Sequence, residues 1–184
     1  PIERLFIQWG FSQVFPAKTM CAHVTTWNKN SSVKFRTDVA MMCKLGFDIK
    51  LADMSKDDET YCRTAVQNYN RLKPVVLEGD MYRLVSPYGS NHTSTMYVGK
   101  DKDKAAVFAF DIHPRYAEKI LPVRLQGLDA DKMYRVKEIN LMPGANSSLS
   151  GNGEVFSGEF LMNVGLNLFT AQQLNSRVIE VVAE

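Results

Sequence analysis

Few side chains in this sequence have the types and spacing that catalysis or ligand binding needs. Asp48 lies in a predicted strand and Asp53 lies near its C-terminal end, so these carboxyl groups are candidates for acid or base chemistry. His23, Trp27 and Asn28 lie close together around the end of a short apolar run. An aromatic face suits the apolar side of a sugar ring, and an amide can hydrogen-bond to pairs of hydroxyl groups.

Other kinds of chemistry find little support in the residue pattern. The phosphate-binding and dinucleotide-binding glycine motifs are absent, and so is the G-x-S-x-G motif of hydrolases. Cys21, Cys43 and Cys62 are an odd number on apolar segments, which predicts buried free thiols. The cysteines form no C-x-x-C pair and the histidines are scattered, so we expect neither a metal site nor a cofactor.

The composition is that of an ordinary globular chain. It has 184 residues, of which 45% are hydrophobic and 23% are charged. The 22 Lys and Arg and the 20 Asp and Glu are interspersed and give a net charge of +2, so a nucleic-acid partner is not indicated. No apolar run is long enough to span a bilayer, and the first residues do not resemble a signal peptide.

The first residues predict a helix followed by a strand. Ile2, Leu5, Phe6 and Trp9 recur at i, i+3, i+4 and i+7, which places four large apolar side chains on one face of a helix that begins at Pro1. The run 20–24 is too short for a helix and is typical of a buried strand.

The pattern repeats further along the chain. Apolar spacing predicts a helix over 33–45, ended by Gly46, and alternation over 47–51 predicts a short strand. Ser55 has the position of an N-cap for a third helix, with Asp58 three residues on. The acidic residues 57–59 therefore suit the helix dipole and are not a catalytic pair. Helices alternating with strands indicate a parallel sheet with a right-handed crossover.

From about residue 90 the apolar period becomes alternating. Turn-rich stretches separate several short runs of this kind. Successive strands without intervening helices predict an antiparallel sandwich or barrel. The predicted strands are 93–100, 105–112, 120–125, 133–139 and 177–183.

Three segments carry a resemblance to a known family. The run E-R-L-x-I-Q-x-G-x-S-x-x-x-P-x-x-x-M-x-x-H-V resembles a segment of the glycoside hydrolase family 36 α-galactosidases, or melibiases. The run L-E-G-D-M-Y-R-L-V-S-P at 77–87 and the run G-E-F-L-M-N-V-G-L at 158–166 resemble later segments of the same family. The matching positions of the first run are Glu3, Arg4, Leu5, Ile7, Gln8, Gly10, Ser12, Pro16, Met20, His23 and Val24.

The resemblance implies a fold. The opening helix would be the sixth of a (β/α)8 barrel, and the two predicted strands would be its seventh and eighth. We therefore expect an α/β plus all-β chain: residues 1–87 would be the C-terminal remnant of the barrel, and residues 88–184 an antiparallel β-sandwich domain.

The resemblance also implies a reaction and a partner. Family members hydrolyse terminal α-galactosides by a retaining mechanism, which uses two carboxyl groups roughly 5 to 5.5 Å apart. In the family the acid/base aspartate directly precedes the matched run, so both catalytic aspartates would lie upstream of Pro1. We expect no catalytic residue in this chain, no activity of the chain alone, and the N-terminal part of the same enzyme as its partner. Asp53 is then more simply a loop residue.

Candidate substrate contacts follow from the same mapping. The loop after the seventh strand lies on the active face of such barrels, which makes His23, Trp27 and Asn28 the candidate sugar-side residues. A plainer interpretation is that His23 is a core histidine or one that supports the site without touching the sugar, and that Trp27 packs on a neighbouring loop. The family usually has H-V-S-x-x-P-N-H-Q where this chain has H-V-T-T-W-N-K-N, so the glycoside preference stays open.

Two alternatives accompany this hypothesis. The same scaffold is compatible with transglycosylation or with another α-glycoside. The C-terminal half is compatible with a sugar-binding or purely structural module, and its lack of clustered exposed aromatic residues favours a supporting role. Because the opening helix and both strands would lack barrel neighbours, we also predict an exposed apolar patch and a homo-oligomer.

Overall fold

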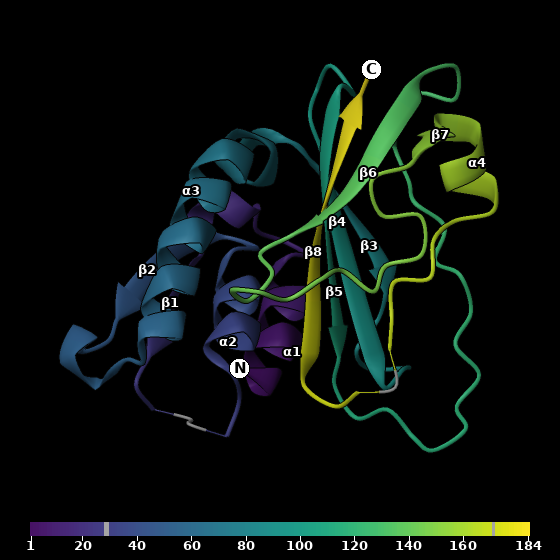
Figure 1. Cartoon of the computed structure of the whole chain (residues 1–184). Coiled ribbons are helices and arrows are strands. Elements are labelled where there is room, and N and C mark those ends of the chain that lie inside the picture. Colours follow the sequence, from purple (N-terminus) through teal and green to yellow (C-terminus); the bar gives the residue numbers. More distant parts are fainter. Residues whose placement is uncertain (28–29, 171) are drawn as a thin grey trace.

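A layer of helices packs against one face of a large antiparallel sheet in the computed structural model of the chain (Figure 1). The structure describes residues 1–27, 30–170 and 172–184. The helical layer also contains a small parallel sheet. Its elements are α1 (Ile2–Phe11), η1 (Ala17–Thr19), β1 (Cys21–Thr25), α2 (Val33–Ala40), β2 (Lys44–Asp48), η2 (Leu51–Asp53) and α3 (Lys56–Glu78).

The opening helix, the first strand and the parallel pairing are confirmed. β1 and β2 pair in parallel, from Cys21 opposite Lys44 to Thr25 opposite Asp48, and α2 connects them. The second strand begins earlier than predicted because the ladder to β1 takes up residues 44–48. Gly46 was predicted to end a helix, which is wrong, since α2 ends at Ala40 and Gly46 lies inside β2.

The third helix begins as predicted. The Ser55 hydroxyl accepts a hydrogen bond from the Asp58 backbone N–H at 3.1 Å, which satisfies one of the free donors of the first turn. α3 then runs for 23 residues. Tyr61, Ala65 and Leu72 form its most buried stripe, facing α2 and the large sheet.

The large sheet has six strands in the order β3-β4-β5-β8-β6-β7, and every neighbouring pair is antiparallel. β8 therefore lies between β5 and β6, although it is the last strand along the chain. The elements are β3 (Asp80–Val85), β4 (His92–Val98), β5 (Lys104–Asp111), β6 (Met133–Ile139), β7 (Val155–Ser157), α4 (Gly158–Asn163) and β8 (Asn175–Ala183).

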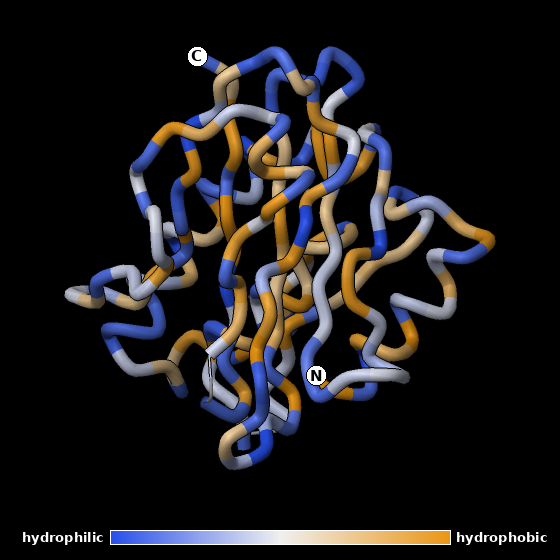
Figure 2. The backbone as a smooth tube through the Cα atoms, turned by 90° about the vertical axis from the view of Figure 1, so that its right-hand side faces the viewer, coloured by the Kyte–Doolittle hydropathy of each residue, from blue (hydrophilic) through white to orange (hydrophobic). Residues whose placement is uncertain are grey.

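Two apolar cores lie on the two faces of this sheet. Phe108 and Val178 belong to the core beneath the helical layer, whereas Val107 and Ile179 belong to the core on the opposite face. In the view of Figure 2 the apolar residues recur along the strands in the middle of the molecule. The alternation along each strand thus supplies both cores, as the sequence pattern predicts.

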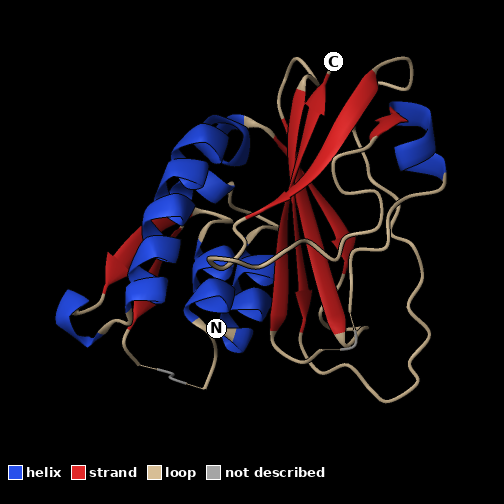
Figure 3. Ribbon diagram, in the orientation of Figure 1, coloured by secondary structure: helices blue, strands red, loops and turns tan. Residues whose placement is uncertain are grey.

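Among the described residues, the face of the large sheet opposite the helical layer is not covered by the second sheet that a sandwich would have. In the part of the chain that the structure describes, loops and α4 cover that face in place of a second sheet (Figure 3). The predicted strand 120–125 was wrong and is reduced to a single bridge between Val123 and Leu166. Pro122 gives a physical reason, because proline has no N–H to donate to a ladder.

These loops are tied to the sheet by buried polar groups. The Asp111 carboxylate accepts hydrogen bonds from the backbone N–H and the hydroxyl of Thr170, the latter at 2.8 Å. The Arg177 guanidinium donates to the carbonyl of Leu168 and to the Ser148 hydroxyl. The side chains of Asp111 and Arg177 are almost fully buried, so the loops form a fixed layer over the core on the far face of the sheet.

Candidate functional site

β1 turns its polar side chains to one face of the small parallel sheet. Ala22 is 0% and Val24 is 1% exposed, and both pack in the core that α2 and α3 form over this sheet. Because side chains alternate along a strand, Cys21, His23 and Thr25 point to the opposite face. The large sheet does not cover that face, so Cys21 and His23 are exposed.

His23 lies across a glycine of the neighbouring strand. His23 and Gly46 are opposite each other in the ladder, and a Cβ atom on Gly46 would lie 2.5 Å from Cδ2 of the imidazole. Glycine is therefore the residue that leaves room for the ring. The side chain of His23 is exposed on the open face, so it is not part of the core of this chain. Strand alternation with Ala22 and Val24 is the signal that would have placed it there.

Of the candidate residues, His23 is the middle residue of β1 and Trp27 follows the carboxyl end of that strand. Trp27 lies two residues beyond the strand and is 80% exposed, so it does not pack on a neighbouring loop. Asn28 lies outside the described residues. Arg36 of α2 donates a hydrogen bond from its guanidinium to the carbonyl of Thr25 at 2.5 Å, which holds the end of the strand against the helix.

A hollow of about 320 Å³ with polar and apolar lining lies at the same edge, between the segments that follow β1 and β2. It offers both signs of charge to a polar molecule. Asp53 lies on the turn η2, and Asp58 lies in the first turn of α3, so the first is a loop residue and the second belongs to the helix cap, as predicted. The lining includes Arg36, Lys50, Asp53 and Asp58.

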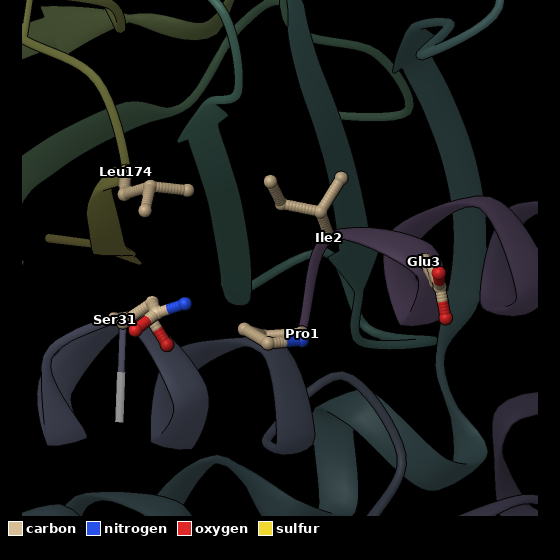
Figure 4. Close-up of a pocket in the computed structure, with 6 residues that line it drawn as sticks. Pro1, Ile2, Glu3, Ser31 and Leu174 are labelled. Atoms are coloured by element: carbon tan, nitrogen blue, oxygen red, sulfur yellow. The ribbon is translucent and has the colours of Figure 1, made fainter. Parts of the chain in front are cut away.

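A second hollow, of about 290 Å³, lies between the start of α1, the segment before α2 and the segment before β8 (Figure 4). Ile2 and Leu174 provide apolar surface, and Glu3, Asn30 and Ser31 provide polar groups. Leu174 comes from the segment just before β8, and sequence reasoning missed it because no spacing pattern marks such a loop residue. The large sheet thus reaches the end of the molecule where the candidate residues lie.

The three thiols differ in environment. Cys21 is exposed, Cys62 is half-buried and Cys43 is buried, so the prediction of three buried thiols is wrong for Cys21. Burial raises the pKa of the Cys43 thiol to about 12 and that of Cys62 to about 11. Within residues 1–27, 30–170 and 172–184, no three His, Cys, Asp or Glu side chains form a group with the geometry of a metal site.

None of the helices in the described part of the chain combines the length and the apolar character that crossing a membrane needs.

Comparison with known families gives two matches that follow each other along the chain. Residues 1–79 match the family model described as Melibiase, and residues 92–181 match the model described as the glycosyl hydrolase family 36 C-terminal domain. The two models thus meet in the segment that holds β3 and the turn after it.

Individual relatives agree with these models. The chain is 33% identical to α-galactosidase 2 of Hypocrea jecorina over 97% of its own length and 23% of the length of that relative. It is similar to the crystal structure of a variant of the family 36 α-galactosidase AgaA from Geobacillus stearothermophilus in complex with stachyose, with a TM-score of 0.86 and 27% identity. That match covers 100% of this chain and 24% of the other. AgaB of the same organism matches with a TM-score of 0.85 and 26% identity.

Proposed function

Because the chain belongs to glycoside hydrolase family 36, we propose that it is the C-terminal part of an α-galactosidase and supports the part that carries out hydrolysis. The observation that carries this proposal is that the two family models match one after the other, over residues 1–79 and 92–181. The chain spans about a quarter of the curated relatives that it matches. We place the two catalytic carboxyl groups of the retaining mechanism in the remaining three quarters.

The small parallel sheet is the proposed remnant of the barrel. Two features support this assignment: β1 and β2 are joined through α2 as neighbouring barrel strands are, and the helices cover one face of the pair. The other face, with Cys21, His23 and Thr25, would then line the barrel interior. We propose that the chain divides into a barrel part, residues 1–87, and a C-terminal domain, residues 88–184. β3 belongs to the first part by sequence, but it pairs with β4 and so joins the large sheet.

His23 and Trp27 are the proposed sugar-side residues of this chain. His23 is exposed on the open face of β1, and Trp27 is exposed just beyond the carboxyl end of that strand. Barrel enzymes bind substrates at that end of their strands, which supports the assignment. Asn28 remains a prediction from the sequence. The proposed substrate class is terminal α-galactosides, the class to which the stachyose bound by the AgaA variant belongs.

The open side of α1 supports a partner that covers it. Ile7, Phe11 and Phe15 are 57%, 52% and 49% exposed and line a groove of about 440 Å³ beside Cys21. In the proposed enzyme the upstream part of the same polypeptide fills this groove. In the isolated chain the groove would drive self-association, and we keep a homo-oligomer as part of the proposal, to be tested by sedimentation.

A chimera tests the proposed function. The quarter of Hypocrea jecorina α-galactosidase 2 that matches this chain is replaced by the chain itself, and turnover of a chromogenic α-galactoside is measured. We expect the chimera to hydrolyse the substrate and the isolated chain to be inactive. The matched control is the same chimera with Phe11→Asp, which puts a charge into the groove and should abolish turnover.

Two results would overturn the proposal. One is a chimera that is folded by circular dichroism and by its unfolding transition, yet has no turnover. The other is turnover by the isolated chain that disappears when Asp48 or Asp53 is changed to Asn, because it would place the reaction in this chain.

A further inference from the structure

A buried carboxylate joins the helical layer to the large sheet. Asp38 of α2 is 0% exposed, and its Oδ2 atom accepts hydrogen bonds from Lys34 Nζ at 2.5 Å and from Ser176 Oγ at 2.7 Å. Its Oδ1 atom accepts from Tyr61 OH at 2.9 Å and from Asn140 Nδ2 at 3.1 Å. These five residues, the Asp38 cluster, come from α2, α3, β8 and the segment after β6.

Such a cluster is sensitive to the loss of any member. A buried carboxylate loses its hydration and is stable only when a counter-charge and hydrogen-bond donors replace it. Here Lys34 supplies the charge, and its ammonium also donates to the Ser176 carbonyl at 2.9 Å. The bonds to Ser176 join α2 directly to β8, an inner strand of the large sheet, in addition to the apolar packing of Phe35 and Val39.

The same helix holds the end of β1. Arg36 lies two residues before Asp38, so the two side chains leave α2 in different directions. The Arg36 guanidinium donates to the Thr25 carbonyl at 2.5 Å, at the last residue of β1. α2 is therefore fixed to β8 on one side and to the carboxyl end of β1 on another.

We infer that Asp38 is a positioning residue, which fixes α2 on β8 and through α2 holds the carboxyl end of β1 in place. The large sheet then helps to position the carboxyl end of β1, where a sugar would bind, without contacting the sugar itself. This inference rests on the proposed function in one respect, namely that the end of β1 faces the substrate. The mechanical link itself needs no substrate.

Another contact between the layers provides a matched control. Tyr97 of β4 is 1% exposed, and its hydroxyl donates to the Met42 carbonyl at 2.7 Å. Met42 lies just before β2, at the opposite end of the parallel pair. Loss of the Tyr97 hydroxyl thus removes a buried bond between the same layers without touching the Asp38 cluster.

Amide hydrogen exchange of the purified 184-residue protein tests the link. The variants are Ser176→Ala, Asp38→Asn and the control Tyr97→Phe, and the exchange of residues 22–26 is compared with that of β5 in each. We expect Ser176→Ala to speed exchange of residues 22–26 relative to β5 by roughly fivefold, the effect of one hydrogen bond. Asp38→Asn should speed it by roughly tenfold or more, because it also breaks the ion pair. Tyr97→Phe should leave the ratio unchanged.

The outcomes separate the inference from the proposed function. An unchanged ratio in Ser176→Ala, or an equal change in Tyr97→Phe, would show that the Asp38 cluster contributes general stability without positioning β1, and would overturn the inference. If Asp38→Asn does not fold, Ser176→Ala alone decides. The measurement needs neither an α-galactoside nor the upstream part, so an inactive chimera would leave its result intact.

Discussion

The two sheets of the molecule differ in how completely their own chain covers them. β4, β5 and most of β8 are buried on both faces, by the helical layer on one side and by loops and α4 on the other. The pair β1 and β2 is covered on one face, its other face is open, and neither of its edges pairs with a further strand in the described structure.

The large sheet therefore mainly provides stability, and the parallel pair carries the candidate functional residues. The large sheet has the burial of a self-sufficient core, whereas the parallel pair depends on the large sheet through α2 and α3 and still leaves polar side chains exposed. Exposed strand edges are an association hazard unless another element covers them. The open pair is thus the part of the chain that an upstream partner would complete.

The same substitution in the two regions should have effects of very different size on folding. Phe108 is 0% exposed in the core between the helices and the large sheet, and Phe11 is 52% exposed beside the open pair. Phe108→Asp loses about 1.5 to 3 kcal/mol of burial and adds several kcal/mol for an unpaired buried carboxylate, against a total stability of about 5 to 15 kcal/mol. We expect it to be unfolded at 25 °C, as judged by circular dichroism.

Phe11→Asp should change the free energy of unfolding by about 1 kcal/mol or less, measured by urea denaturation, because its side chain already contacts water. It should also reduce self-association in sedimentation. A native-like Phe108→Asp protein, or an unfolded Phe11→Asp protein, would contradict the contrast between the two regions.

The reactivity of Cys21 and Cys43 tests the same contrast within the helical layer. At neutral pH the thiolate fraction of Cys43, whose pKa burial raises to about 12, is roughly a thousandfold below that of a thiol at the ordinary value of 9.0. The exposed Cys21 should therefore react with iodoacetamide while Cys43 stays unmodified, as peptide mass spectrometry would show. Cys21→Ser is the control that should remove the fast-reacting site. Equal labelling of both cysteines would mean that the core beneath the parallel pair opens readily.

The smallest expected effect concerns a loop at the edge of the large sheet. Hydrogen bonds from the Arg115 backbone N–H and then from the Asn91 amide lower the pKa of the Glu118 carboxyl group. A lowered folded-state pKa means that the stabilisation is present above the unfolded-state pKa and is lost as the pH falls through the folded-state value. Glu118→Gln should therefore flatten the fall of the urea midpoint between about pH 5 and pH 3. An unchanged slope would show that these bonds do not stabilise the fold.

The sequence predicts the helical layer well because its signals are local. The stripe of Leu5 and Phe6, the cap at Ser55 and the alternation around Val24 each depend on neighbours within a few residues. The position of β2 was missed by a few residues because it depends on pairing with β1, which is 23 residues away in the ladder from Cys21 to Lys44.

The far face of the large sheet could not be predicted in the same way. The loops that cover it are held by Asp111, which binds Thr170, and by Arg177, which binds Ser148; these partners are distant in sequence and have no periodic spacing. The site was predicted as residue types near the end of a strand. That His23 lies across Gly46, and that Leu174 approaches the same end of the molecule, follows from tertiary packing.

The place of β8 in the sheet has a consequence for synthesis. Its two neighbours, β5 and β6, leave the ribosome earlier, but neither can complete its ladder until residues 175–183 arrive. Asp38 likewise waits for Ser176, made 138 residues later. The chain should therefore stay incompletely folded until its last strand is translated, and during that interval its apolar strands are exposed to chaperones and to aggregation. Truncation of the chain before residue 175 would remove β8 and would leave the sheet open between β5 and β6.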